Sequence, residues 1–376
     1  MKGKLTQILE NLESASVLLA GKKVCAGFDG CIDSVVKVIK SKTEEGESIF
    51  FELIDQFGNY ISGKKGAGFS LETQELLKKI GGNMPIMANA IGRLCTNVDC
   101  IGAFGYPSIA PAFKDIDKNC TLYSYCNPGF TTAMEFLDGK FMLAEMKDLN
   151  NSDWDTLKNT IGLTTIKEAF LTSELICLLN WSEMYHSSNI WEGLLQEVFI
   201  QEDDRSNKRH FFFDLSDCST RSPKDVRVAI KLIKKYNIFG KVTLSLNTNE
   251  AAIIYKTLIK EQLPGNINNI GSKLFKTLKI DTLIIHSSRM SQLWDTTGSY
   301  SNKPDFISKP LISTGAGDNF NAGFCIGKML GLDPEISIML ANIVSNIYIL
   351  NGQSPDLIIL KKHVADLLLT FSDTQN

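Results

Sequence analysis

The stretch Ser313-Thr-Gly-Ala-Gly-Asp-Asn-Phe-Asn-Ala-Gly-Phe324 is the most informative part of this chain. Its first two glycines let the backbone turn tightly, and small and apolar residues in a helical pattern follow. Successive backbone N–H groups at such a turn, aimed along a helix N-terminus, form a site for an anion such as a transferring phosphoryl group. Asp318 falls in the first turn of that helix, where its carboxylate can accept a proton from an attacking hydroxyl. The segment therefore predicts an anion site beside a general base.

The same segment has a simpler interpretation, a glycine-rich turn in which Asp318 only caps a helix. Short glycine motifs match by chance often enough to keep this alternative open. Other phosphate-binding motifs do not fit, because Phe320 stands where a dinucleotide fingerprint needs glycine and no third glycine follows Gly66-Ala-Gly68. The chain also lacks the sequence GxxxxGK followed by Ser or Thr, so it is not a Walker-type NTPase.

Short apolar runs alternate with helical patterns along most of the remaining chain. This alternation predicts an α/β fold whose central, mostly parallel sheet has helices on both faces. The expected strands are residues 23–27, 98–102, 175–179, 210–214, 241–245 and 282–285. The expected helices include residues 3–19 and 223–236, a helix entered from a glycine-rich turn within 81–94, and C-terminal helices that begin at Asp333-Pro334-Glu335 and Ser354-Pro355-Asp356.

Two segments break this rhythm, residues 48–62 and 130–145. Both are rich in residues that favour strands, and both contain a hairpin-like turn, at Phe57-Gly-Asn and at Leu137-Asp-Gly. The pattern leaves two alternatives open: a small sheet that stands off the main one, or extra edge strands of the main sheet.

The composition of the 376 residues is ordinary for a globular protein, with 44% hydrophobic and 22% charged residues and a formal net charge of −3. Lysine pairs such as Lys22-Lys23 are short, so we expect no nucleic-acid partner. Nine cysteines without a CxxC pair predict reduced thiols, and four histidines without an HExxH cluster argue against structural zinc. We see no signal-peptide pattern and no apolar stretch long enough to cross a bilayer, so we expect a cytoplasmic protein without membrane association.

Four segments occur in the order and spacing typical of a known family. Residues 313–324 look like its second signature, and the glycine-rich stretch 81–105 is similar, without gaps, to its first. Asn247-Thr-Asn-Glu250 matches its N-x-x-E motif, and Gly27-Phe-Asp-Gly-Cys-Ile-Asp33 resembles its opening strand with a substrate-binding aspartate. Over most of residues 23–352 the chain therefore resembles the ribokinase-like (PfkB) carbohydrate kinases, and four ordered motifs are far more specific than one.

The resemblance implies a single ribokinase-like α/β domain over residues 1–376, in which segments near 48–62 and 130–145 form a small β-sheet lid over the substrate. It implies that ATP, with Mg²⁺, phosphorylates a hydroxyl of a sugar or sugar-like molecule at the carboxyl ends of the strands. A lid fits this chemistry because water must be kept from the phosphoryl group. Family members often pair through their lids, so the resemblance also allows a homodimer.

The resemblance assigns roles at the phosphoryl-transfer centre. Asp318 would be the general base. Asp214 and Arg221 resemble the family's strand-end aspartate and following arginine, although an ordinary surface position also suits Arg221. The anion hole would be formed by Gly315, Ala316 and Gly317.

On the nucleotide side, Asn247 and Glu250 would organise Mg²⁺ indirectly, through water, and oxygen ligands suit this ion. The alternative for this pair is a polar helix start, with Asn247 as the N-cap and Glu250 in the first turn. Asn342 and Ser345 lie on the helix that usually borders the adenine of ATP in the family.

On the substrate side, Asp33 follows the first strand, and its carboxylate can accept hydrogen bonds from two adjacent hydroxyls of a sugar or polyol. Asp29 is the rival candidate, and either residue could instead cap a turn. Gly81 and Gly82 would let the backbone approach the substrate closely, and Asn83 could donate a hydrogen bond to it.

The chain departs from the family pattern at four places. Ile312 replaces an aspartate that often helps to build a monovalent-cation site, and Ile86 replaces an asparagine that contacts substrate. The loop His286-Ser-Ser-Arg289 replaces a glycine-containing loop over the nucleotide, where Arg289 could contact a phosphate. Tyr106-Pro107 stands where an aspartate often follows. These changes indicate a divergent subgroup with an unusual acceptor.

The sequence leaves alternative functions open. A nucleoside could replace the sugar as acceptor in a kinase of the same fold. A non-catalytic ligand-binding or regulatory protein on this scaffold is the third possibility, since fold does not guarantee function. The retained Asp318, its neighbouring glycines and the Asn247–Glu250 pair argue against the third, because a degraded enzyme is expected to lose its base first.

Overall fold

A nine-stranded sheet forms the centre of the computed structural model, which describes residues 2–202 and 209–373. Neighbouring strands are parallel from β12 to β6, and β13 and β14 complete one edge in antiparallel pairs. In order across the sheet, the strands are β14 (Gly298–Asn302), β13 (Ser291–Asp295), β12 (Thr282–His286), β11 (Gly240–Asn247), β10 (Arg209–Asp214), β9 (Leu175–Leu178), β1 (Lys23–Gly27), β5 (Asn97–Gly102) and β6 (Cys120–Ser124).

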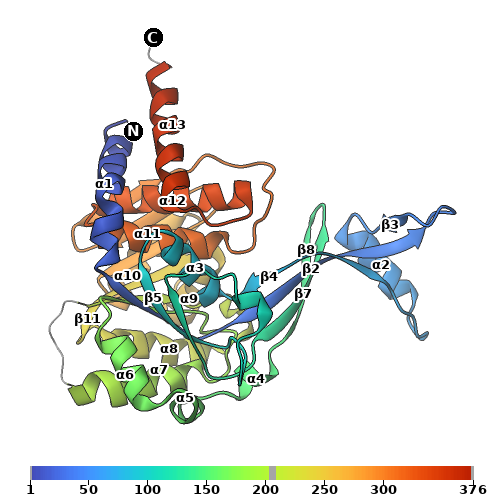
Figure 1. The fold of residues 1–376 in the computed structure, drawn as a ribbon, viewed down its shortest axis with the longest axis horizontal. Helices are drawn as coiled ribbons and strands as arrows, with labels where there is room; N and C mark the ends of the chain where they lie inside the picture. The colour runs from blue at the N-terminus through green and yellow to red at the C-terminus, as the bar shows by residue number, and fades with distance from the viewer. Residues whose placement is uncertain (1, 203–208, 374–376) are drawn as a thin grey trace.

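Helices cover both faces of this sheet (Figure 1). One face carries α1 (Lys2–Ala20), α3 (Asn83–Arg93), α11 (Ala316–Met329), α12 (Pro334–Asn351) and α13 (Leu357–Asp373). The other carries α4 (Lys147–Asn151), α5 (Trp154–Ile161), α6 (Leu163–Leu171), α7 (Ser187–Leu194) with its π-helical continuation Leu195–Ile200, α8 (Pro223–Tyr236), α9 (Thr248–Leu258) and α10 (Ile267–Leu278). Two short 3₁₀ turns cover Pro111–Phe113 and Cys218–Thr220.

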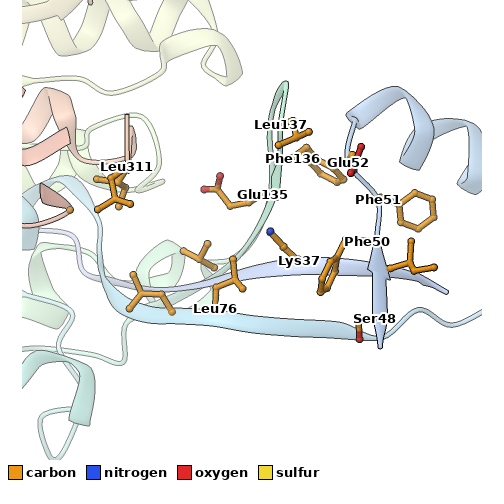
Figure 2. A pocket seen from close by; sticks show the side chains of 15 residues that line it. Lys37, Ser48, Phe50, Phe51, Glu52, Leu76, Glu135, Phe136, Leu137 and Leu311 are labelled. Carbon is orange, nitrogen blue, oxygen red and sulfur yellow. The ribbon is translucent and has the colours of Figure 1, made fainter. Parts of the chain in front are cut away.

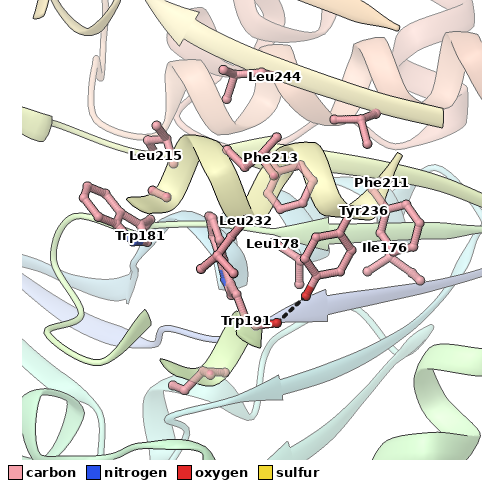
Figure 3. Packing of buried hydrophobic residues seen from close by; sticks show 14 of the residues in the cluster. Ile176, Leu178, Trp181, Trp191, Phe211, Phe213, Leu215, Leu232, Tyr236 and Leu244 are labelled. Carbon is pink, nitrogen blue, oxygen red and sulfur yellow. Dashed lines mark hydrogen bonds between the residues drawn. The ribbon is translucent and has the colours of Figure 1, made fainter. Parts of the chain in front are cut away.

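Each buried strand feeds a hydrophobic core on both of its faces, because successive side chains point to opposite sides. On β10, Phe211 and Phe213 join the core under α7 and α8, whereas Phe212 joins the core under α11. Figure 3 shows the first of these cores, in which the Tyr236 hydroxyl donates to the Trp191 carbonyl oxygen over 2.6 Å. This double burial explains why the strands are continuous apolar runs in the sequence.

A second, smaller sheet reaches out from one side of this body (Figure 1). It contains β2 (Cys31–Lys42), β3 (Ser48–Phe50), β4 (Thr73–Gly81), β7 (Gly129–Phe136) and β8 (Gly139–Glu145). β2 continues almost directly from the central strand β1, so the small sheet begins at the carboxyl edge of the main one. The α/β class, the mostly parallel sheet and the separate small sheet are confirmed.

The prediction for residues 130–145 is correct, because β7 and β8 form a hairpin around Leu137-Asp138. The prediction for residues 48–62 is wrong over its second half, since β3 is short and α2 spans Ile54–Gly63. The aromatic ring of Phe57 packs on Phe51 and Phe136, and the Asp138 carboxylate accepts from the Ile54 N–H at the helix start. Tertiary packing therefore overrides the strand-like composition and the Gly-Asn turn signal.

Two strands of the small sheet, β2 and β4, were not expected as strands. They pair antiparallel over most of their length and set Asp33 opposite Lys79. No helix in the described part of the chain combines the length and the apolar character needed to cross a bilayer. The single domain over residues 1–376 stays a prediction, and residues 1, 203–208 and 374–376 lie outside the described residues.

Candidate active site

Polar side chains meet at the carboxyl ends of the central strands, beside the start of α11. Asp214 ends β10, Asn247 ends β11 and His286 ends β12. Parallel strands place these ends at one edge of the sheet, where ligands bind in open α/β folds. A cavity of about 240 Å³ opens there, and its walls include Asn83, Asp214, Asn247, Glu250, Gly317 and Asp318.

The glycine loop has the tight geometry that its sequence predicts. Gly315 has φ of +93° and stands as the N-cap of α11 without a capping side chain. A Cβ atom on Gly315 would lie 2.6 Å from the Tyr348 Oη and 3.3 Å from the Ile86 Cδ1, so no larger residue fits. The Ala316 N–H donates to the Ser313 carbonyl oxygen over 3.3 Å, whereas the N–H groups of Gly317 and Asp318 have no acceptor within the helix, and both residues line the cavity, as an anion site requires.

Asp318 is buried in the first turn of α11. Burial, followed by the nearby charges of Asp214 and Asp29, raises the pKa of the Asp318 carboxyl well above its usual range, while a hydrogen bond with the Asn83 side chain opposes that rise. A carboxylate whose ionised form is disfavoured in this way is a stronger base than an exposed one. Asp318 therefore lies on the cavity wall as a potential proton acceptor, and the cap alternative does not describe it.

Asp214 is held rigidly beside Asp318. One Asp214 carboxylate oxygen accepts from the Ser216 N–H over 2.8 Å and the other accepts from the Asn321 Nδ2 over 2.7 Å. The Ser245 hydroxyl donates to Asn321 in turn, so α11, β10 and β11 share one buried network. Two buried carboxylates this close repel, which favours a bound cation at this wall of the cavity.

Asn247 and Glu250 form a capping box at the start of α9. The Asn247 side chain accepts from the N–H groups of Asn249 and Glu250, and Glu250 accepts from both the backbone and the side chain of Asn247. The helix-start alternative is thus realised, yet both residues also line the cavity. Burial and then the charge of Asp214 raise the pKa of Glu250 to about 8.

Because this pKa is raised, the free energy of unfolding should depend on pH through Glu250, and Glu250→Gln should remove that dependence. Glu250 is protonated more readily in the folded than in the unfolded chain, so its contribution is full below about pH 4 and is lost as the pH rises through about 8. The free energy of unfolding of the wild type, relative to Glu250→Gln, is therefore expected to fall between about pH 5 and about pH 8, measured by urea denaturation. Glu261→Gln at an exposed site beside Lys273 is the control. A constant difference across this range would contradict the prediction.

Asp29 is fully buried and caps α3. Its carboxylate accepts from the N–H groups of Asn83 (2.8 Å) and Met84 (2.9 Å) and from the Asn180 Nδ2 (2.7 Å). A Cβ on Gly82 would lie 2.6 Å from an Asp29 oxygen, so this glycine admits the carboxylate to the helix start. Asp29 therefore holds the glycine turn in place, and its oxygens are already engaged by protein donors.

Asp33 lies on β2 with its carboxylate against Gly81, where any Cβ would overlap it. Burial raises the pKa of Asp33, while the charge of Lys79 and a hydrogen bond with Thr131 lower it. The Asp29 carboxylate accepts three protein hydrogen bonds, whereas Asp33 has one, with Thr131, so Asp33 is the better candidate of the two rival aspartates to meet a substrate. Gly81 and Gly82 are thus approached by protein carboxylates, which is a different reason for glycine than the expected substrate contact.

A second cavity, of about 590 Å³, adjoins the first at His286 and Gly317, and its walls also include Asn342 and Ser345. Asn342 donates to Ser291 and Asn302, and the Ser345 hydroxyl donates to the Ala316 carbonyl oxygen over 2.9 Å. The His286 ring stacks on Phe320 at 4.6 Å between ring centres, and burial lowers the pKa of His286 to about 4. This histidine is therefore neutral near pH 7.

Two arginines suggested by the sequence lie outside these cavities. Arg289 is exposed and its guanidinium lies 4.5 Å from the centre of the Phe306 ring, off the cavity wall. Arg221 donates to the carbonyl oxygens of Trp181 and Ser182 and lies over the Trp181 ring, so it holds the loop after β9.

Both isoleucines that depart from the family pattern are part of apolar walls. Ile86 faces Gly315, as described above, and Ile312 lines a cavity of about 760 Å³ on the small sheet. Figure 2 shows Lys37 and Glu135 in this space, with Leu311 on the far wall. The Lys140 Nζ, from β8 of the same sheet, donates to the Thr314 hydroxyl next to Gly315.

Sequence reasoning missed the residues that the small sheet and α12 bring to the site, above all Lys79, Lys140 and Tyr348. The signal existed, because alternation along a strand at 73–81 would have placed Lys79 and Gly81 on one face. The sequence alone did not reveal which residue of β2 lies opposite Lys79, because this depends on the register between β2 and β4.

Oxygen donors at the cavity suit a magnesium ion that keeps several water ligands. Asn247, Glu250, Asp214 and Asp217 all line the cavity, and each carries side-chain oxygen. Within residues 2–202 and 209–373, no cluster of three or more His, Cys, Asp or Glu side chains is arranged to hold a metal ion directly.

Comparison with known proteins identifies similar chains. A family model described as prokaryotic ketohexokinase matches residues 6–367. A ketohexokinase from Haloferax volcanii is 25% identical over 345 residues, which cover 91% of each chain. Two solved structures share the fold: an adenosine kinase from Sinorhizobium meliloti, with TM-score 0.65, 14% identity and coverage of 92% and 99%, and Arabidopsis thaliana ribokinase complexed with ribose and ATP, with TM-score 0.61, 14% identity and coverage of 91% and 98%.

Proposed function

We propose that this chain, which belongs to the prokaryotic ketohexokinase family and is therefore a kinase, transfers the γ-phosphoryl group of ATP to a hydroxyl of a ketohexose. The resemblance inferred from the motifs is confirmed for family, fold class and enzyme class. The observation that best supports the finer proposal is the position of Asp318, buried beside the glycine loop in the cavity that also receives Asn247 and Glu250.

In the proposed reaction, Asp318 accepts the proton of the acceptor hydroxyl while that oxygen forms a bond to the γ-phosphorus. The bond between the γ-phosphorus and the bridging oxygen breaks, and ADP leaves with the electron pair. Burial and the charge of Asp214 raise the pKa of Asp318, which makes it a better proton acceptor. Asn83, whose side chain hydrogen bonds with Asp318, would orient the carboxylate.

The first turn of α11 would stabilise the transferring phosphoryl group. The backbone N–H groups of Gly315, Ala316 and Gly317 carry the positive end of the helix dipole and need no side chain to reach a phosphate. The larger adjoining cavity, which borders Asn342, would then hold the rest of the nucleotide.

Asn247 and Glu250 would hold Mg²⁺ through water at the neighbouring wall. When bound, such an ion neutralises phosphate charge during the transfer. Glu250 retains lone pairs for water, although both of its carboxylate oxygens accept hydrogen bonds from Asn247. The raised pKa values of Glu250 and Asp214 indicate that a bound cation would stabilise the ionised carboxylates of this cavity wall.

The small sheet would act as the lid of the acceptor site. It contributes Asp33 and Lys140, and Lys140 contacts Thr314 in the glycine loop itself. A cover that reaches from the acceptor side to the anion site would exclude water from the phosphoryl group.

A coupled assay of ADP formation with ATP, Mg²⁺ and a panel of acceptors tests the proposal. We expect turnover with D-fructose and a product whose mass increases by one phosphoryl group, with D-ribose and adenosine as poor acceptors. Preferential turnover of adenosine would instead identify a nucleoside kinase. Calorimetric binding of a sugar with no ADP formation from any acceptor would favour a non-catalytic binding protein.

A further inference from the structure

Lys79 is a buried cation at the acceptor side of the site. It lies on β4 directly across from Asp33, and alternation along the strand turns the neighbouring Lys78 to the other face, where its ammonium lies over the Phe130 ring. The Lys79 Nζ is buried and has no hydrogen-bond partner among the described residues. An ammonium group has three donors, and leaving all of them unused away from water is unfavourable.

Charged groups from the small sheet and from α11 act on Lys79. Asp33, Lys140, Asp318 and Glu135 are close enough to influence its charge. Burial lowers the pKa of Lys79 and raises the pKa of Asp33, although each charge supports the other. Asp33 has a hydrogen bond with Thr131, whereas the Lys79 ammonium has no acceptor among the described residues, and a ligand with several oxygen atoms would supply one.

A cavity of about 310 Å³ lies beside Lys79, with Ile86, Asn89 and Tyr348 among its walls. Ile86 and Tyr348 are also the side chains nearest to the Cβ position of Gly315. Two side chains, Ile86 and Tyr348, therefore separate this cavity from Gly315, so a molecule beside Lys79 would lie one side chain away from the glycine loop.

From this arrangement we propose that Lys79 is a specificity-determining residue, whose ammonium donates a hydrogen bond to one oxygen of the phosphate acceptor while Asp33 accepts one from a neighbouring hydroxyl. A donor and an acceptor set opposite each other recognise two adjacent oxygens of different character, such as a hydroxyl next to a carbonyl or ring oxygen. The inference rests on the proposed function, because it concerns the acceptor of that same reaction.

The charges around Lys79 favour an uncharged acceptor. Lys140 is engaged by Thr314 and lies 3.6 Å from Glu135, and Asp33 opposes Lys79. The cavity walls also carry Lys78 and Arg93, with Asp115 as their counter-charge. Next to Lys79, however, Asp33 and Glu135 place negative charge that disfavours a phosphate or carboxylate, so the acceptor class is a neutral polyol or hydroxy-ketone.

Substitution of Lys79 tests this role. Lys79→Met keeps the length of the side chain but removes its charge and donors, and we expect KM for D-fructose to rise about 10- to 100-fold, the scale of one hydrogen bond to a charged group. KM for ATP is expected to stay within about twofold. Lys79→Gln, which retains a donor, should fall between Met and the wild type. Lys42→Met is the control, because Lys42 is an exposed lysine of the same small sheet that pairs with Glu72 and is not among the walls of this cavity.

Monodeoxy analogues of D-fructose, used as competitive inhibitors, distinguish recognition from a purely structural role. In the wild type, the analogue that lacks the oxygen bound by Lys79 should bind more weakly than D-fructose. In Lys79→Met this analogue should bind as well as D-fructose, while the other analogues should still bind more weakly than D-fructose. A uniform loss across all analogues would mean that Lys79 only positions Asp33, and would overturn the inference. A preference of the wild type for D-fructose 6-phosphate would overturn the neutral acceptor class.

Calorimetry of D-fructose binding without ATP gives a readout that does not depend on turnover. Lys79→Met is expected to weaken binding while the chain stays folded, as a cooperative thermal unfolding transition would show, because the variant removes an ammonium that has no hydrogen-bond partner among the described residues. If the wild type phosphorylates D-fructose and Lys79→Met binds it with the same affinity and KM, this inference is rejected and the proposed function stands. Sugar binding that depends on Lys79, without any phosphorylation, would reject the proposed function instead.

Discussion

Asp318→Asn is expected to lower kcat for the sugar acceptor by about 100- to 10,000-fold, the range that a general base contributes. The amide keeps the shape of the side chain and loses its basicity. Removing a buried charge beside Asp214 relieves repulsion, so the free energy of unfolding should be equal to or greater than that of the wild type. Steady-state kinetics and urea denaturation of the same preparation measure the two effects.

The control for this variant is Asp356→Asn. Asp356 caps α13 by accepting from the Ile359 N–H over 2.8 Å, and asparagine caps helices equally well. Its turnover should match that of the wild type. If Asp318→Asn kept turnover within about threefold while Asp356→Asn also did, Asp318 would not be the base.

Gly317→Ala keeps its N–H, but its methyl group would hold a phosphate away from the loop donors, so turnover is expected to fall on the order of 100-fold, the scale of one lost oxyanion interaction, without harm to the fold. A Cβ on Gly317 meets nothing nearer than the His286 Cε1 at 3.5 Å, which is ordinary contact, and alanine suits the first turn of a helix. The added methyl group would, however, project toward the cavity proposed for the phosphates. Activity and thermal unfolding, measured together, separate the two consequences.

Gly315→Ala provides the comparison, because its defect has a different origin. Its φ of +93° disfavours a side chain, and the new Cβ would press on the Tyr348 hydroxyl at 2.6 Å. We expect a loss of about 1–3 kcal/mol in the free energy of unfolding. Full activity in Gly317→Ala would contradict the anion-hole assignment, whereas unchanged stability in Gly315→Ala would contradict the described loop geometry.

The proposed roles of Asp33, Asn247 and Glu250, the dependence on Mg²⁺ and the pairing of two chains stay predictions. The structure changes their relative weight. Asp33 gains over Asp29, because the Asp29 oxygens already cap α3. Asn247 and Glu250 cap α9 and also line the cavity, so the two interpretations of this motif, a helix start and a part of the site, do not exclude each other.

The sequence by itself determined the central strands, the glycine loop and Asp318, because these depend on neighbouring residues: apolar runs of strand length, a tight turn, and the first turn of a helix. Only the tertiary structure decided that residues 54–63 form a helix, that Asp29 is a cap, and that Lys79 faces Asp33. Each of the latter depends on contacts between distant segments, namely the packing of Phe57 on Phe136, the meeting of β1 with α3, and the register of β2 with β4. Local sequence does not encode such contacts, because their partners are set by burial and strand pairing across the whole chain.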